Sequence, residues 1–210
     1  MSNEYLHFDS KELSIPKLQG LMQGAVAPRP IVFASTIDRM GHPNLSPFSF
    51  FNIFGVNPPV LIFSPSRRGR DNTTKHTYEN IREVSEVVVN VVTYAMAQKV
   101  SDSSADFPRE VNEFEAVGFT MEPSLVVKPF RVKESPVQFE CKVLQVIETG
   151  NRGGAGILVI CEILQLHVNP EILNEKGRID PNKIDLVGRL GQDYYVRASG
   201  AALFEIAKPK

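Results

Sequence analysis

The chain has 210 residues, of which 42% are hydrophobic and 22% charged, and its formal net charge at pH 7 is −1. This length suits one good-sized domain or two small ones, and the composition is that of an ordinary globular protein. A nearly neutral chain has no global field to attract nucleic acid or an anionic membrane, and no apolar run approaches the ~18 residues of a membrane span. Residues 1–9 contain no signal-peptide core. We therefore expect a cytoplasmic protein with no nucleic-acid or membrane partner.

The N-terminal part of the chain predicts one helix followed by a pair of strands. Apolar residues recur at a spacing of about 3.6 within residues 10–27, which is typical of a helix. This helix ends before Pro28, because proline disfavours a helical conformation in the residue before it. The β-branched residues 31–37 predict a strand, and residues 38–41 predict a hairpin turn. Residues 44–54 would then return antiparallel to that strand.

Four further strands are predicted in the rest of the chain. Short apolar runs at 60–63 and 87–92 are typical of strands buried on both faces. Residues 157–168 form the last long strand, entered through the glycine-rich turn 152–156. That turn is not a phosphate loop, since it lacks the Lys-Ser/Thr pair and leads into a strand. Residues 137–146 alternate, with one face predicted to carry Val137, Phe139, Cys141, Val143 and Gln145.

Two short helices are predicted between the strands. Thr73 or Thr74 can cap the first of them. The second covers residues 95–103, with Met96 and Val100 on its apolar side. Many strands, few helices and no βαβ alternation favour a closed barrel over a doubly wound sheet.

The cysteines and histidines form no recognisable metal or redox motif. Cys141 and Cys161 lie inside apolar, strand-like runs, without a partner at metal-ligand or redox spacing, so we expect two buried, reduced thiols. The four histidines, His7, His42, His76 and His167, have no partner at metal spacing or in a triad context. The sequence therefore predicts no metal site, and we interpret the histidines as surface or structural residues.

A polar and basic segment predicts an anion site. Ser64, Ser66 and Arg67 lie just past a predicted strand, and Lys75 and Thr77 lie at the start of the next predicted helix. A helix N-terminus presents unpaired N–H groups and a partial positive charge, and basic side chains add charge-assisted bonds to phosphate oxygens. The alternative is that a threonine merely caps the helix while the basic side chains are solvated.

An aromatic segment with embedded serines predicts a site for a flat ring. The segment comprises Ser46, Pro47, Phe48, Ser49 and Phe50. Two serine hydroxyls in such a strand are costly to bury without partners, and a heterocyclic ring would offer those partners. The alternative is an aromatic strand whose serines bond locally to the main chain.

An ordered set of motifs resembles the flavin reductase-like family, whose fold is the FMN-binding split β-barrel. The resemblance continues more weakly to the end and so covers nearly the whole chain. The pieces that carry it are Arg29-Pro30-Ile31, Ser35-Thr36, the turn 38–41, Asn44, residues 47–51, Pro58-Pro59, Lys75-x-Thr77-x-x-Asn80-Ile81, and, less closely, residues 88–91, 188–190 and 194–195.

The resemblance implies a mainly β protein with a few helices. Residues 1–210 would form a single flavin reductase-like domain, with residues 1–27 as an N-terminal segment whose short helix packs on the barrel. The loop that includes Ser64 and Lys75 would hold the phosphate of FMN, and the aromatic segment would hold its ring. The segment around Tyr195 would close over the cofactor across a homodimer interface.

The resemblance also implies an FMN-binding oxidoreductase that takes hydride or electrons from NADH or NADPH and passes them to a flavin or another acceptor. Hydride transfer to a flavin requires no protein acid or base, so we predict no catalytic side chain. Two alternatives stay open, because fold does not fix function. One is an FMN-holding electron carrier that uses a protein partner instead of a nicotinamide site. The other is a non-catalytic barrel that only binds ligands.

Overall fold

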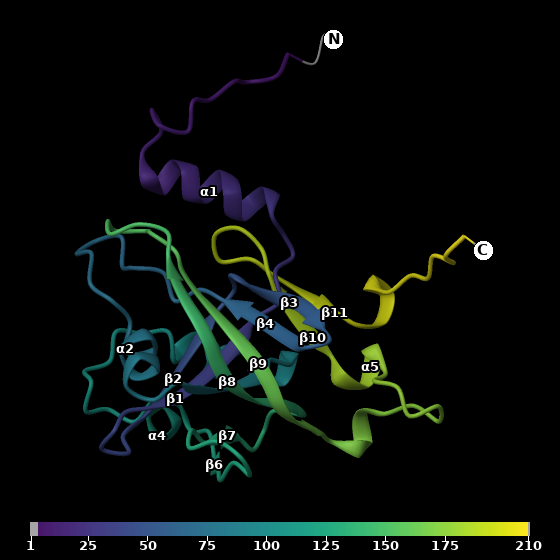
Figure 1. Cartoon of the computed structure of the whole chain (residues 1–210). Helices are drawn as coiled ribbons and strands as arrows, with labels where there is room; N and C mark the ends of the chain where they lie inside the picture. Colours follow the sequence, from purple (N-terminus) through teal and green to yellow (C-terminus); the bar gives the residue numbers. More distant parts are fainter. Residues whose placement is uncertain (1–3, 210) are drawn as a thin grey trace.

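The computed structural model describes residues 4–209, which fold around one coiled antiparallel sheet of seven strands (Figure 1). Its edge strands, β2 and β3, are joined by only Ser49 and Phe50, yet neither is a hydrogen-bonded neighbour of the other. The sheet therefore curls round to meet itself without closing, as a split barrel. In spatial order the strands are β2 Pro43–Phe48, β1 Val32–Ile37, β5 Glu86–Val91, β8 Val137–Glu148, β9 Ile157–Val168, β4 Pro59–Phe63 and β3 Phe51–Val56.

Helices and two small hairpins lie outside the seven-stranded sheet of this barrel. No helix within residues 4–209 is both long and apolar enough to cross a membrane. The helices are α1 Ile15–Ala25, α2 His76–Glu83, α3 Ala97–Asp102, α4 Glu113–Val117 and α5 Pro181–Ile184, with 3-10 turns η1 Tyr94–Met96, η2 Pro170–Ile172 and η3 Gly200–Ala202. The hairpins are β6 Met121–Glu122 with β7 Arg131–Val132, and β10 Leu186–Arg189 with β11 Tyr195–Ala198.

The barrel interior is an apolar core built from the predicted strands. Every residue of β1 is buried, and the β-branched side chains of β5 and β9 pack against it. Cys141 and Cys161 both lie in this core as free thiols, as predicted. Burial raises the pKa of each thiol, that of Cys161 to about 12, so both stay protonated and unreactive.

One predicted strand is two strands in the structure. Residues 44–54 do not return antiparallel as a unit, because only β2 pairs with β1, while β3 pairs with β4. The break falls at Ser49 and Phe50, where the chain leaves one edge of the sheet for the other. The alternating sequence pattern does not mark this break, because both halves are extended.

β8 also departs from the prediction, because its alternation is interrupted by register shifts. One shift lies between Glu140 and Cys141, and another between Val143 and Gln145. Each shift changes which residues face the core. Gln145 is consequently exposed, and Val146 packs against the core in its place.

The first helix after β4 begins differently from the prediction. The N-cap of α2 is Lys75, without a side-chain cap, so neither Thr73 nor Thr74 caps it. The Thr74 hydroxyl instead donates to the Glu79 carboxylate at 2.7 Å. The predicted second helix corresponds to η1 and α3, and its apolar residues Met96 and Val100 are buried as expected.

The C-terminal hairpin β10–β11 was not predicted, and it docks where the barrel begins. Arg29 and Arg189 exchange two backbone hydrogen bonds of 2.9 and 2.8 Å. Gly188 permits this approach, because a Cβ there would lie 2.9 Å from the Cβ of Pro28. The docking carries Tyr195 to the edge strand β2.

Candidate functional site

A groove runs along β2, where the barrel is split. It consists of two adjoining cavities of about 260 and 110 Å³ that share Pro47, Phe48 and Ser104. We call them the hairpin end and the helix end of the β2 groove, after the hairpin β10–β11 and helix α2 that wall them. The end of β2 thus lies between a hairpin and a helix that are distant in sequence.

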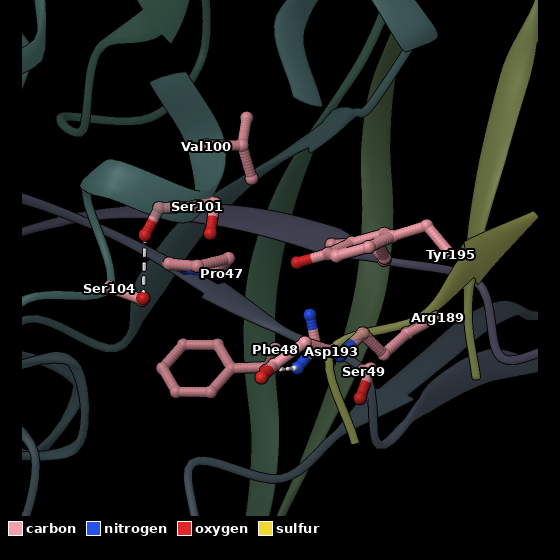
Figure 2. Close-up of a pocket in the computed structure, with 10 residues that line it drawn as sticks. Pro47, Phe48, Ser49, Val100, Ser101, Ser104, Arg189, Asp193 and Tyr195 are labelled. Atoms are coloured by element: carbon pink, nitrogen blue, oxygen red, sulfur yellow. Dashed lines mark hydrogen bonds and ion pairs between the residues drawn. The ribbon is translucent and has the colours of Figure 1, made fainter. Parts of the chain in front are cut away.

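The hairpin end is walled by an aromatic ring stacked on a cation (Figure 2). Tyr195 extends from β11 into the cavity, on the side facing Pro47 and Ser101. The guanidinium carbon of Arg189 lies 4.4 Å from the centre of the Tyr195 ring, a cation–π contact. Arg189 also pairs at 3.4 Å with Asp193, which is fully exposed.

Ser49, at the end of β2, is held by a buried arginine. Arg29 is 6% exposed, and its Nε donates to the Ser49 hydroxyl at 3.3 Å. Its other donors reach three backbone carbonyls, those of Gln23 at 2.5 Å, Val26 at 2.6 Å and Leu190 at 2.8 Å. Because Ser49 accepts from a cation, its own hydrogen is free and polarised for donation to a ligand.

The Arg29 guanidinium makes no ion pair with a carboxylate among residues 4–209. Burial lowers the pKa of Arg29, and the nearby charge of Arg189 lowers it further. The Arg29 guanidinium nevertheless keeps its charge, because an arginine side chain stays protonated at neutral pH. The hairpin end therefore has two positive charges, Arg29 and Arg189, against one exposed carboxylate, Asp193, and this balance favours a ligand that carries or develops negative charge.

The helix end gathers basic groups at the start of α2. It is lined by Ser46, Arg68, Lys75 and His76, and α2 directs its first N–H groups there. Arg68 Nε is buried without a hydrogen-bond partner, although an Asp106 oxygen lies 3.4 Å away. An unsatisfied buried donor is costly, so this geometry suits an additional anionic acceptor.

Lys75 is the second basic group at the helix end. Within residues 4–209 its ammonium makes no hydrogen bond or ion pair. Burial lowers the pKa of Lys75, and the neighbouring Arg68 charge lowers it further. Glu113 also lines this end, where burial raises the pKa of its carboxyl and its oxygens accept from the Asn44 amide and the Leu45 N–H. A bound phosphate would relieve the repulsion between the two basic groups.

The structure brings together six of the eleven residues predicted for the site. Thr77 is 1% exposed and donates to Asn44 at 2.8 Å, and the Ser64 hydroxyl accepts from the Ile157 N–H at 3.0 Å. Both hydroxyls are therefore committed to the fold. The six along the β2 groove are Ser46, Pro47, Phe48, Ser49, Lys75 and Tyr195.

The remaining three predicted residues line a different cavity. A cavity of about 360 Å³ lies between α1 and the side chains of Phe50, Ser66 and Arg67, and we call it the α1 cavity. Arg67 is engaged by Glu148 at 3.0 Å. No residue of α1 is buried, although the helix lies over the barrel (Figure 1).

Sequence reasoning missed several groove residues. Arg68 directly follows Arg67, and nothing in the sequence distinguishes the two side chains. Ser104 and Arg189 come from segments whose placement depends on tertiary docking. His42 and His167 lie outside the groove, paired with Asp38 at 2.9 Å and Glu140 at 2.7 Å. No cluster of three metal-ligating side chains occurs in the part of the chain that the structure describes.

Comparison with known proteins identifies the family. The model of the flavin reductase like domain matches residues 24–182, well over half of the chain. The chain belongs to the flavin reductase-like family. An uncharacterised protein of Aquifex aeolicus is 39% identical to this family member over 201 residues, covering 96% of this chain and 100% of the relative. YwrF of Bacillus subtilis, also uncharacterised, is 30% identical, with 90% and 93% of the two chains covered.

Solved structures of similar proteins confirm the fold of this flavin reductase-like chain. Nitrilotriacetate monooxygenase component B of Bacillus cereus has a TM-score of 0.89 and 29% identity, covering 98% of this chain and 100% of its own. The 2-nitrobenzoate 2-nitroreductase NbaA of Pseudomonas fluorescens has a TM-score of 0.84 and 28% identity, covering 98% and 99%. A protein with a split barrel domain from Shewanella frigidimarina has a TM-score of 0.80 and 26% identity, covering 97% and 100%.

Proposed function

We propose that this protein is an FMN-dependent oxidoreductase that accepts reducing equivalents from NADH or NADPH and passes them to a flavin or another acceptor. The observation that carries the proposal is the β2 groove, which joins two basic side chains at a helix N-terminus, Arg68 and Lys75, to a strand end with a polarised hydroxyl. The similar proteins named as a monooxygenase component and a nitroreductase support a redox role.

The helix end of the β2 groove would hold the phosphate of FMN. Within the described residues 4–209, Arg68 Nε has no hydrogen-bond partner and Lys75 has no ion pair, and α2 offers its first N–H groups. A phosphate monoester satisfies all three at once, which is why helix N-termini are common phosphate sites. One terminal phosphate suits this end better than the diphosphate of FAD, since its cavity measures only about 110 Å³.

The hairpin end would hold the flavin ring. Bound FMN supplies the hydride and electron chemistry, and the protein supplies binding, orientation and electrostatics. Ser49 would donate its hydrogen to a ring oxygen or nitrogen, because Arg29 occupies its acceptor side at 3.3 Å. Arg29 and Arg189 would stabilise negative charge that develops on the ring. Phe48 and Tyr195 would exclude water from its faces.

The visible spectrum of the purified protein tests this function, followed by titration with FMN and FAD and by anaerobic addition of NADH and NADPH. We expect tighter binding of FMN than of FAD, and bleaching of the flavin band by at least one nucleotide. Equal or tighter FAD binding would contradict the phosphate assignment. Bound FMN that neither nucleotide reduces would favour the electron-carrier alternative.

Removing the charge of Lys75 should weaken FMN binding. We expect Lys75→Met to raise the FMN dissociation constant about ten- to hundred-fold, because a hydrogen bond to a charged group contributes about 1.5–3 kcal/mol. Lys142→Met, on the exposed side of β8, is the matched control and should bind FMN normally. Fluorescence titration of both variants gives the comparison, and an unchanged Lys75→Met would place the phosphate elsewhere.

Ser49 should matter for the rate of reduction rather than for folding. We expect Ser49→Ala, saturated with FMN, to be reduced by NADPH or NADH about ten- to hundred-fold more slowly, which corresponds to ~1.4–2.7 kcal/mol. His42→Ala and His167→Ala, at histidines outside the groove, serve as controls that should retain reduction. Stopped-flow absorbance measures all three variants. Loss of reduction in a histidine variant that binds FMN normally would call instead for a protein acid or base.

We also propose that the protein is a homodimer. β3 is an edge strand that leaves Ile53, Phe54 and Val56 exposed at 61%, 64% and 86%, and such an edge is a ready interface. Light scattering at low micromolar concentration should give a mass of about twice the 23.4 kDa of one chain. The Phe54→Glu variant should have a lower mass, closer to that of a single chain. A wild-type mass of a single chain would refute the dimer.

A further inference from the structure

A fourth cavity opens beside the hairpin end of the β2 groove. This outer cavity, of about 480 Å³, lies between α3 and the hairpin β10–β11. It shares Ser101, Arg189, Asp193 and Tyr195 with the hairpin end. A ligand seated in the outer cavity can therefore reach the space that we assign to the flavin ring.

Two tyrosine rings and two guanidinium groups line the outer cavity. Arg189 stacks on Tyr195 with 4.4 Å between guanidinium carbon and ring centre, and Arg197 stacks on Tyr94 at 4.1 Å. The rest of the lining includes the apolar side chains of Val187 and Val196 on the hairpin. Planar cations, aromatic faces and apolar surface together suit a flat, negatively charged ligand.

The two arginines differ in how far their charge is already compensated. Arg197 forms a bidentate pair with Asp185, with distances of 2.7 and 2.8 Å. Among residues 4–209 the only carboxylate paired with Arg189 is Asp193, at 3.4 Å and fully exposed to water, and Arg189 Nη2 also donates to the Gln192 carbonyl at 2.5 Å. An exposed pair of this kind is weak, so Arg189 is the cation that can be released to a ligand.

We propose that the outer cavity binds the second substrate of the reaction, an aromatic compound that carries a phosphate or a carboxylate, through Arg189. The anionic group would replace Asp193 at the guanidinium, and the aromatic part would extend past Tyr195 toward the flavin ring. This inference rests on the proposed function for its redox role, but the binding step does not require FMN. Two kinds of compound combine an aromatic ring with such an anionic group: a nicotinamide nucleotide, which is the first source of this ligand, and an aromatic acid, which is the second.

Calorimetric titration of the purified protein, with and without added FMN, tests the proposal. The probes are NADP⁺ and NAD⁺ for the first source and 2-naphthoate for the second, with uncharged 2-naphthamide as the matched neutral probe. We expect one source to bind, and we expect the neutral probe to bind at least tenfold more weakly than 2-naphthoate if the aromatic acid is that source. Binding of neither source, or equal binding of 2-naphthoate and 2-naphthamide when both bind, would overturn the proposal.

Three variants assign the binding to Arg189. Arg189→Gln should raise the dissociation constant of the probe that binds about ten- to hundred-fold. Asp193→Asn removes the competing carboxylate at an exposed position and should tighten binding by about 1.5- to 5-fold. Arg152→Gln, an exposed arginine in the glycine-rich turn, is the control for general charge and should leave binding unchanged.

Equal weakening in Arg189→Gln and Arg152→Gln, or weaker binding in Asp193→Asn, would refute the assignment. The Asp193→Asn result stands even if Arg189→Gln fails to fold. If the protein binds the anionic probe but not FMN, the proposed function fails while the anionic site stands. If it binds FMN but no probe, the outer cavity is not the substrate site, and anaerobic bleaching of bound FMN by NADH or NADPH then decides the proposed function separately.

Discussion

The buried guanidinium of Arg29 is the contact on which the site depends. It donates to the carbonyls of Gln23, Val26 and Leu190 and to the hydroxyl of Ser49. These four bonds hold together the end of α1, the turn of the hairpin β10–β11 and the end of β2. A buried charge is tolerable only when its donors are satisfied, and here carbonyls satisfy them without a carboxylate. The positive charge is therefore not cancelled locally, and it polarises the hydroxyl that faces the groove.

The split in the barrel explains why a groove lies beside that point. The sheet curls round until only two residues separate β2 from β3, but these two edge strands do not pair with each other. The backbone N–H and C=O groups on their unpaired edges therefore remain available to bind a ligand. The hairpin β10–β11 and the start of α2 then wall the opening on two sides. In this way an aromatic stack and a basic helix end, far apart in sequence, come to line one groove. The fold alone does not define the chemistry, which the charges at the two ends supply.

Local patterns predicted the buried strands, the free thiols, and the aromatic segment and Lys75 that meet in the groove. They could not place the break at Ser49, because both halves of the segment are extended and apolar. They also could not separate Arg68, which lines the groove, from Arg67, which lines the α1 cavity, since adjacent side chains in a loop diverge according to tertiary contacts. Thr77 was predicted to bind phosphate, but its hydroxyl bonds the buried Asn44, a partner 33 residues away. The role of Arg29 depends on contacts from both ends of the chain.

A crystal structure of the protein soaked with FMN tests the central claim most directly. The β2 groove and the α1 cavity are separate, so the electron density of the flavin would show which of the two it occupies. We predict the phosphate within hydrogen-bond distance of Arg68 and Lys75, and the ring edge within hydrogen-bond distance of the Ser49 hydroxyl, with the Arg29 contact to Ser49 retained. Electron density for the flavin in the α1 cavity, with its phosphate at Ser66 and Arg67, would contradict the account.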